Sequence, residues 1–256
     1  MKIGRLLIIT VLILYISPAS AAGVWENASK KEVMDKFRNA LDWFTKTGAY
    51  KVNVSYASFV DHTTAVPYER SEGSFVKDGK NLHSVVLGMH TIQNERYRIT
   101  VSDDEQMIAL NNLSGTEQLP VDMESFSDLL DHVQAIRKQV KAGGTCYRIE
   151  FAPNGLYASF EFELDAAGLL GKLTYFYSAE MTEENDEADE SGNVNKGKIQ
   201  GKPRMEISFY NYQQNLKVDY EKEFSEKKYF TASGKKVTLS EKYRHYELKD
   251  YRYDLK

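Results

Sequence analysis

Alternation of apolar and polar residues along the chain predicts mostly β-strands. Tyrosine and valine alternate with lysine, asparagine and serine over 50–56, so one face of that strand is apolar and the other is polar. The same period of two recurs in later segments, at 72–87, 96–110, 145–151, 157–164, 172–179 and 204–210. These segments predict about nine or ten strands in antiparallel order.

Two segments have helical spacing instead. The first follows Ser29, which with Glu32 forms a capping box, and its apolar residues recur until Gly48. The second is predicted over 123–140, where apolar residues recur three and four positions apart before Gly143. Two helices are few for so many strands.

Turn residues divide the strands, and one segment interrupts them. Tight turns are predicted at Asp78 and Gly79, at 103–104 and near Gly234. The segment 180–203 holds seven acidic residues and three glycines with little to bury, so it is predicted to be a mobile insertion between strands. A tyrosine-rich extension follows at the C-terminus.

The predicted fold is α+β. Strand twist accumulates across a long sheet, so the sheet must curl. We therefore expect a curled, mostly antiparallel sheet, an unclosed β-barrel, with helices packed across its open concave side. Residues 23–256 are predicted to form this single domain.

The N-terminal segment 1–22 has the pattern of a secretory signal peptide. Lys2 and Arg5 precede an apolar run, and small residues follow Pro18. The run is shorter than the roughly 20 residues of a membrane-spanning helix. We expect cleavage near Ala21 or Ala22, and export of a soluble mature chain to the periplasm.

Charge and motifs narrow the function classes. Without Lys2 and Arg5 the chain has 31 basic and 37 acidic residues, a net charge of about −6, which disfavours nucleic acid as a partner. Cys146 is alone, so no internal disulfide is available. No nucleophile elbow, dinucleotide motif or phosphate loop occurs, and no histidine has metal-ligand spacing. We therefore predict no enzyme activity, no cofactor and no metal.

The order of the segments resembles a known family. The helix and long strand are followed by "EGSFVKDGKNLHS", "RYRITVSDDEQMIAL" and later "RMEISFYNYQQNLKVDYEKEF". This order is similar to the periplasmic outer-membrane lipoprotein carrier (LolA-like) family over most of residues 30–225. The matching residues are Gly73, Ile207, Phe209, Asn211, Asn215 and Phe224.

The resemblance implies an unclosed barrel that receives acyl chains, such as the lipid moiety of a lipoprotein. Burial of an acyl chain stabilises a complex by roughly 0.8 kcal/mol per CH2, so a shallow apolar trough can hold one reversibly. The resemblance also implies a monomer that contacts membranes transiently and an envelope protein as partner.

Apolar residues at alternate strand positions are the candidate ligand contacts. They are Val52, Val54, Tyr56, Phe160, Phe162, Leu173, Tyr175, Ile207 and Phe209. An alternative stays open, because the same pattern describes any half-buried sheet. In that case the helices fill the interior, and the protein is a structural or interaction module of the cell envelope.

Overall fold

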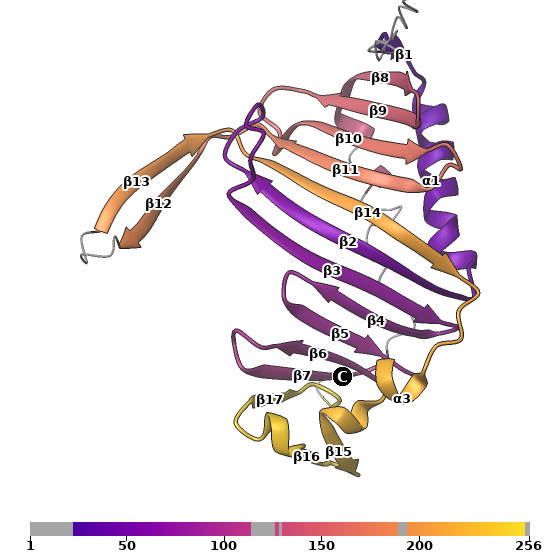
Figure 1. The fold of residues 1–256 in the computed structure, drawn as a ribbon, viewed down its shortest axis with the longest axis vertical. Coiled ribbons are helices and arrows are strands. Elements are labelled where there is room, and N and C mark those ends of the chain that lie inside the picture. The colour runs from indigo at the N-terminus through magenta and orange to yellow at the C-terminus, as the bar shows by residue number, and fades with distance from the viewer. Residues whose placement is uncertain (1–22, 114–125, 128–129, 189–193, 254–256) are drawn as a thin grey trace, which may run out of the picture.

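The structure is a computed structural model that describes residues 23–113, 126–127, 130–188 and 194–253. One 13-stranded sheet dominates it (Figure 1). From edge to edge the order is β1 (Glu26–Asn27), β8 (Val133–Lys141), β9 (Gly144–Phe151), β10 (Tyr157–Asp165), β11 (Leu170–Tyr177), β14 (Arg204–Gln214), β2 (Ala49–Phe59), β3 (Glu69–Asp78), β4 (Asn81–Val86), β5 (Met89–Gln93), β6 (Tyr97–Ser102), β7 (Met107–Asn112) and β17 (Glu247–Asp250).

The sheet is unclosed and almost entirely antiparallel, as the sequence predicted. Among the strands of the described ranges, only β7 and β17 pair in parallel, and β1 and β17 form the two edges. The predicted fold class, α+β with an unclosed, mostly antiparallel sheet, is therefore confirmed, although the sheet has more strands than we expected. No helix in the described ranges is long and apolar enough to cross a membrane.

The first predicted helix is confirmed as α1 (Lys30–Lys46). Ser29 caps it, since its side chain accepts a hydrogen bond from the backbone N–H of Glu32 at 3.1 Å. The other end is held by the buried Lys77 of β3, whose Nζ donates to the carbonyl oxygens of Phe44 (3.2 Å) and Thr45 (3.1 Å). These carbonyls would otherwise lack partners at the helix C-terminus.

The second predicted helix, 123–140, is wrong over most of its described length, since only residues 126–127 are α-helical. A 3-10 turn covers Leu130–His132, and 133–141 is strand β8. A register shift between Val133 and Ala135 places Val133 and Ile136 on the same face, opposite Phe151 and Ile149. This bulge gives a strand the three-residue apolar spacing of a helix. Residues 123–125 and 128–129 lie outside the described residues.

The remaining turns follow the prediction. Gly79 and Gly234 take φ values of 60° and 58°, the left-handed region that glycine tolerates best. Gly234 joins β15 (Phe230–Ser233) to β16 (Lys236–Leu239), a separate ribbon. The segment predicted as a mobile insertion contains a second ribbon, β12 (Met181–Ala188) and β13 (Val194–Gly201), between the paired strands β11 and β14. Its mobility stays a prediction.

The apolar side of the sheet changes between β4 and β5. We call the face that carries α1 the front face. There Phe75 of β3 is followed across the strands by residues that are less apolar, namely Ser84, Thr91, Thr100 and Ala109. On the back face, Ile92, Ile99 and Leu110 lie in one row. Two hydrophobic clusters therefore form on opposite faces of one sheet.

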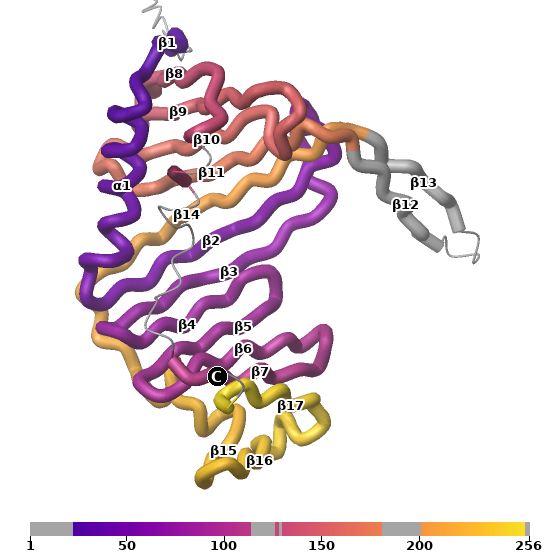
Figure 2. Tube along the Cα trace, turned by 180° about the vertical axis from the view of Figure 1, so that it is seen from behind, coloured from indigo at the N-terminus to yellow at the C-terminus, as the bar shows by residue number. Residues whose placement is uncertain are grey.

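The C-terminal extension covers the back cluster, which we define as the buried residues Ile92, Ile99, Val101, Ile108, Leu110, Tyr229, Phe230 and Tyr243. The extension includes the short helix α3 (Tyr220–Glu223), two 3-10 turns (Glu226–Lys228 and Glu241–Tyr243), the ribbon β15–β16 and β17. In Figure 2 it lies at the end of the sheet farthest from β1.

Candidate ligand-binding face

The structure places all candidate ligand contacts together on the front face. Strand registers align Phe162, Leu173, Ile207 and Tyr56 in one row and Phe160 with Tyr175 in the next. Val54 pairs with Phe209. Tyr175 and Ile207 are partly buried, and the others are buried: Val52, Val54, Tyr56, Phe160, Phe162, Leu173 and Phe209. Their role in binding stays a prediction.

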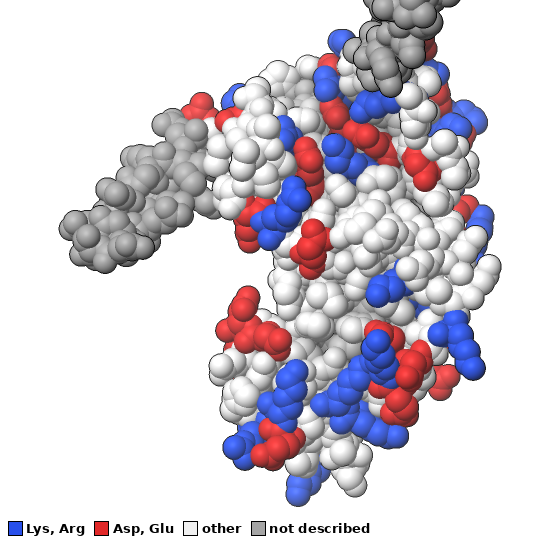
Figure 3. All heavy atoms as spheres, viewed as in Figure 1, with Lys and Arg blue, Asp and Glu red and all other residues white. Residues whose placement is uncertain are grey.

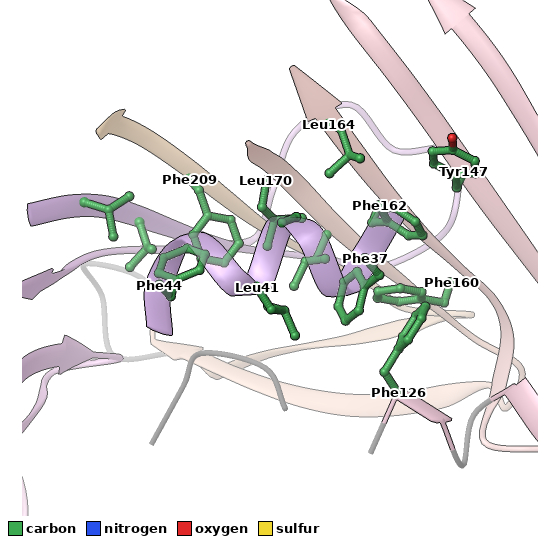
Figure 4. Packing of buried hydrophobic residues seen from close by; sticks show 14 of the residues in the cluster. Phe37, Leu41, Phe44, Phe126, Tyr147, Phe160, Phe162, Leu164, Leu170 and Phe209 are labelled. Carbon is green, nitrogen blue, oxygen red and sulfur yellow. The ribbon is translucent and has the colours of Figure 1, made fainter. Parts of the chain in front are cut away.

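Helix α1 fills one end of this face, which we call the helix half. The Phe37 ring lies 5.1 Å from Phe162 and 3.8 Å from Phe126. Further along the same face of α1, the centre of the Phe44 ring lies 6.0 Å from that of the Phe209 ring. Figure 4 shows these side chains pointing from the helix and the sheet toward one another. In this half the apolar surface is packed by protein atoms, as the alternative prediction of a filled interior required.

The other end of the face is different, and we call it the tyrosine half. It comprises Tyr56, Tyr157, Tyr175, Tyr177, Met205 and Ile207, which share the front face by strand register. Within the described ranges, no ring of α1 stacks on these tyrosines; they contact one another, with Tyr157 5.5 Å from Tyr175 and 5.2 Å from Tyr177. Figure 1 shows α1 over one end of the strands and β12–β13 leaving at the other.

The tyrosine half is largely apolar and uncharged, and its polar atoms are phenol hydroxyls. Burial raises the pKa of Tyr56 to about 12. Burial, and then the neighbouring phenols of Tyr157, Tyr177 and Tyr56, raise the pKa of Tyr175 to about 12. Both phenols are therefore neutral hydrogen-bond donors at neutral pH. Such a surface suits an apolar ligand that has few polar atoms.

The back face of the same strands is charged. Arg148 pairs with Glu161 at 2.5 Å, and Arg204 pairs with Glu206 at 3.1 Å. Figure 3 shows acidic and basic side chains gathered over this part of the sheet. These charged side chains make the back face less suited to an apolar ligand, so the front face is the candidate.

One acidic cluster on that back face has the spacing of a metal site. Potential ligand atoms of Cys146, Glu161 and Glu163 lie within 4.8 Å of one another. Glu161 is already paired with Arg148, and Glu163 with Lys141 at 3.1 Å. Burial and the nearby carboxylates raise the pKa of the Cys146 thiol to about 12, which disfavours the thiolate that binds metals. These residues do not fit a metal centre.

A groove that the sequence did not predict lies beside the helix half. It has a volume of about 830 Å³ between α1 and the turns that follow β8 and β10. Trp43, Tyr147 and Leu164 contribute apolar surface, while Lys36, Lys46 and Lys141 lie around it. None of the candidate contacts lines it. Turn residues and helix side chains form this groove, and no periodic pattern marks such residues.

Three of the residues that carry the family resemblance suit the backbone conformation at their own positions. A Cβ on Gly73 would overlap the carbonyl oxygen of Val85, so the approach of β3 to β4 requires glycine. Asn211 and Asn215 have φ values of 54° and 57°, in the left-handed region that asparagine tolerates best among the other residues. Asn211 lies at the register shift of β14.

Comparison with known proteins finds similar structures only. No family model and no curated protein matches the sequence. Three similar solved structures are lipoprotein LppX of Mycobacterium tuberculosis (9% identity, 75% of this chain and 100% of that chain, TM-score 0.37), LprF of Mycobacterium bovis (9%, 76% and 98%, 0.33) and a LolA superfamily protein of Nitrosomonas europaea (11%, 78% and 99%, 0.28). The last name agrees with the resemblance predicted from the sequence. Because the identities and TM-scores are this low, the function is argued from this chain's own residues.

Proposed function

We propose that this protein binds an acyl chain, or another hydrophobic ligand, on its front face without covalent chemistry. It would act as an exported, lipoprotein-carrier-like protein of the periplasm. One observation carries the proposal: the tyrosine half is an uncharged, largely apolar surface that α1 does not cover. The helix half supplies a rigid support beside it.

The chemistry of the tyrosine half fits reversible binding. Met205 and Ile207 are partly exposed, and each lies next to a tyrosine across the strands. Each CH2 group buried there contributes roughly 0.8 kcal/mol, so a chain of moderate length gains enough to bind and can still be released. Lipoprotein lipid moieties are ligands of this kind.

The second candidate function is an envelope interaction module with a filled interior. It is favoured by the packing of Phe37 against Phe126 and Phe162 in the helix half. In that case the protein would bind an envelope protein rather than a lipid. The two functions predict different behaviour of the tyrosine half, so one set of experiments separates them.

Native mass spectrometry of the purified protein should reveal co-purifying lipid, and the delipidated protein should take up a fluorescent fatty acid. The Met205→Trp variant fills space in the tyrosine half, and we expect it to reduce uptake at least tenfold. Val140→Trp is the matched control, because Val140 is 64% exposed and lies at the groove instead. Absence of both lipid and uptake in the unmodified protein would favour the interaction module.

A further inference from the structure

A buried histidine joins the back face of the sheet to the C-terminal extension. Nδ1 of His83 in β4 lies 2.9 Å from Oε2 of Glu223 in α3. Nε2 of the same ring is buried and has no hydrogen-bond partner in the described part of the chain. Because an ionised carboxylate only accepts hydrogen bonds, Nδ1 carries the proton of the neutral ring. A second proton would therefore enter at Nε2, where no acceptor meets it.

The surroundings of His83 disfavour the charged ring. The His83 side chain is only 15% exposed. The ring of His90 in β5 stacks on it, with 5.8 Å between the ring centres. Burial lowers the pKa of His83, Glu223 opposes this shift, and His90 and Lys228 add to it. The imidazolium is therefore better accommodated in water than at this junction.

Helix α3 has little else to hold it in place. It has four residues, none of which is buried, and so short a helix is not stable by itself. The chain after α3 is held separately, because the buried Glu226 accepts a hydrogen bond from Nδ2 of Asn94 at 2.7 Å and pairs with Arg96. Asn94 Nδ2 also donates to the carbonyl oxygen of Phe224 at 3.2 Å. We call these contacts the Glu226 clamp.

We propose that α3 is an acid-sensitive latch, which leaves β4 when His83 takes up a proton at Nε2, while the Glu226 clamp keeps the rest of the extension on the sheet. The latch is closed above pH about 6.5, because His83 is then neutral whether α3 is bound or released. Below that pH the released state binds the proton more readily, so its population grows. Release uncovers the back surface of β4 and β5 around His83 and His90. The latch does not depend on the ligand proposed for the front face.

Amide hydrogen exchange, followed by NMR on the full-length mature protein, tests the latch. The reporters are the amides of Glu223 and Phe224, which donate to the carbonyl oxygens of Asp219 (2.9 Å) and Tyr220 (2.8 Å). Exchange is measured at pH 7.5 and 5.5 and divided by the intrinsic chemical rate at each pH. We expect protection of both amides to fall about fivefold or more at pH 5.5, while protection in α1 stays constant.

Three variants assign the effect to His83. In His83→Gln the protection of α3 should be the same at both pH values, even if α3 is looser throughout, because glutamine takes up no proton. In Glu223→Gln the fall should be larger, since the group that offsets the burial of the imidazolium is gone. His245→Gln is the control, because His245 is an exposed histidine of the same extension, and its profile should match that of the unmodified protein.

Equal protection of α3 at both pH values in the unmodified protein would overturn the latch. A fall that persists in His83→Gln would overturn it as well, since another group would then be responsible. A fall of the same size in α1 would show that acid loosens the whole sheet rather than α3. Uptake of a fluorescent fatty acid tests the front face separately, so either proposal can fail without the other.

Discussion

The two halves of the front face are built from the same strands, yet they differ in what covers them. In the helix half, Phe37 and Phe44 of α1 pack against Phe162 and Phe209. In the tyrosine half, Tyr157 packs against Tyr175 and Tyr177, and no ring of α1 stacks on these tyrosines within the described ranges. The difference shows that an apolar row on a strand does not by itself distinguish core from binding surface. Whether the row becomes core or binding surface depends on which residues pack against it.

The back cluster gives a second instance of the same lesson. Strands β5–β7 turn their apolar side to the back, and the C-terminal extension supplies Tyr229, Phe230 and Tyr243 to cover it. The extension is therefore part of the fold rather than an appendage. It also adds β17 beside β7, which protects an edge that would otherwise be open to pairing.

The largest expected effect is in the helix half. Phe37 is fully buried against three aromatic rings, so Phe37→Ala should reduce the free energy of unfolding by about 3–5 kcal/mol. Met205→Ala in the tyrosine half should cost much less, because Met205 is only partly buried. Urea unfolding measures both. Equal losses would contradict the distinction between the halves.

Phe230→Ala should remove about 3 kcal/mol, since Phe230 is fully buried in the back cluster. Hydrogen exchange should then speed up in β5–β7 and in the extension while α1 stays protected. The exposed Tyr251 provides the control, as Tyr251→Ala should change little. Uniform acceleration across the sheet would show that the two clusters are one cooperative unit.

Lys77→Met should destabilise the protein by about 2 kcal/mol, because the carbonyl oxygens of Phe44 and Thr45 lose a buried charged donor. Lys46→Met is the control, as Lys46 is exposed and pairs with the exposed side of its own helix at Asp42. Hydrogen exchange in the last turn of α1 measures the effect. An unchanged last turn would mean that Lys77 does not hold the helix.

Two tyrosine substitutions compare the halves directly. Tyr212→Phe should cost about 1 kcal/mol, since it removes the hydrogen bond to Leu170. Tyr175→Phe should leave the free energy of unfolding unchanged or raise it slightly, because its hydroxyl has no partner in the described chain. Urea unfolding of the ligand-free protein checks both. A loss in Tyr175→Phe equal to that in Tyr212→Phe would reveal a hidden partner.

The smallest effect concerns pH and the extension. His83 of β4 lies 2.9 Å from Glu223 of α3, beside His90 and Lys228. Burial lowers the pKa of His83, and Glu223 offsets only part of this shift. The folded protein therefore binds this proton less readily than the unfolded chain, and stability should fall as pH drops below about 6.5.

Urea unfolding at pH 7.5 and 5.5 measures this fall in the unmodified protein. The loss should shrink in His83→Gln, which cannot take up the proton. The same loss in both proteins would assign the pH dependence to other groups.

Local sequence determined much of this protein. Ser29 and Glu32 determined the start of α1, Gly79 and Gly234 determined two turns, and alternation identified the front-face residues. Each of these depends on neighbours within a few positions, which the sequence displays directly. The resemblance rests partly on local backbone conformation, since Gly73, Asn211 and Asn215 meet backbone constraints at their own positions.

Tertiary structure decided the rest. The bulge at Val133 and Ala135 made a strand of a segment with helical spacing, because pairing with β9 outweighed the local pattern. The change of apolar side between β4 and β5 depended on the distant extension that covers it. The division of the front face into a helix half and a tyrosine half became visible only once α1 had been placed, because burial depends on residues far apart in the sequence.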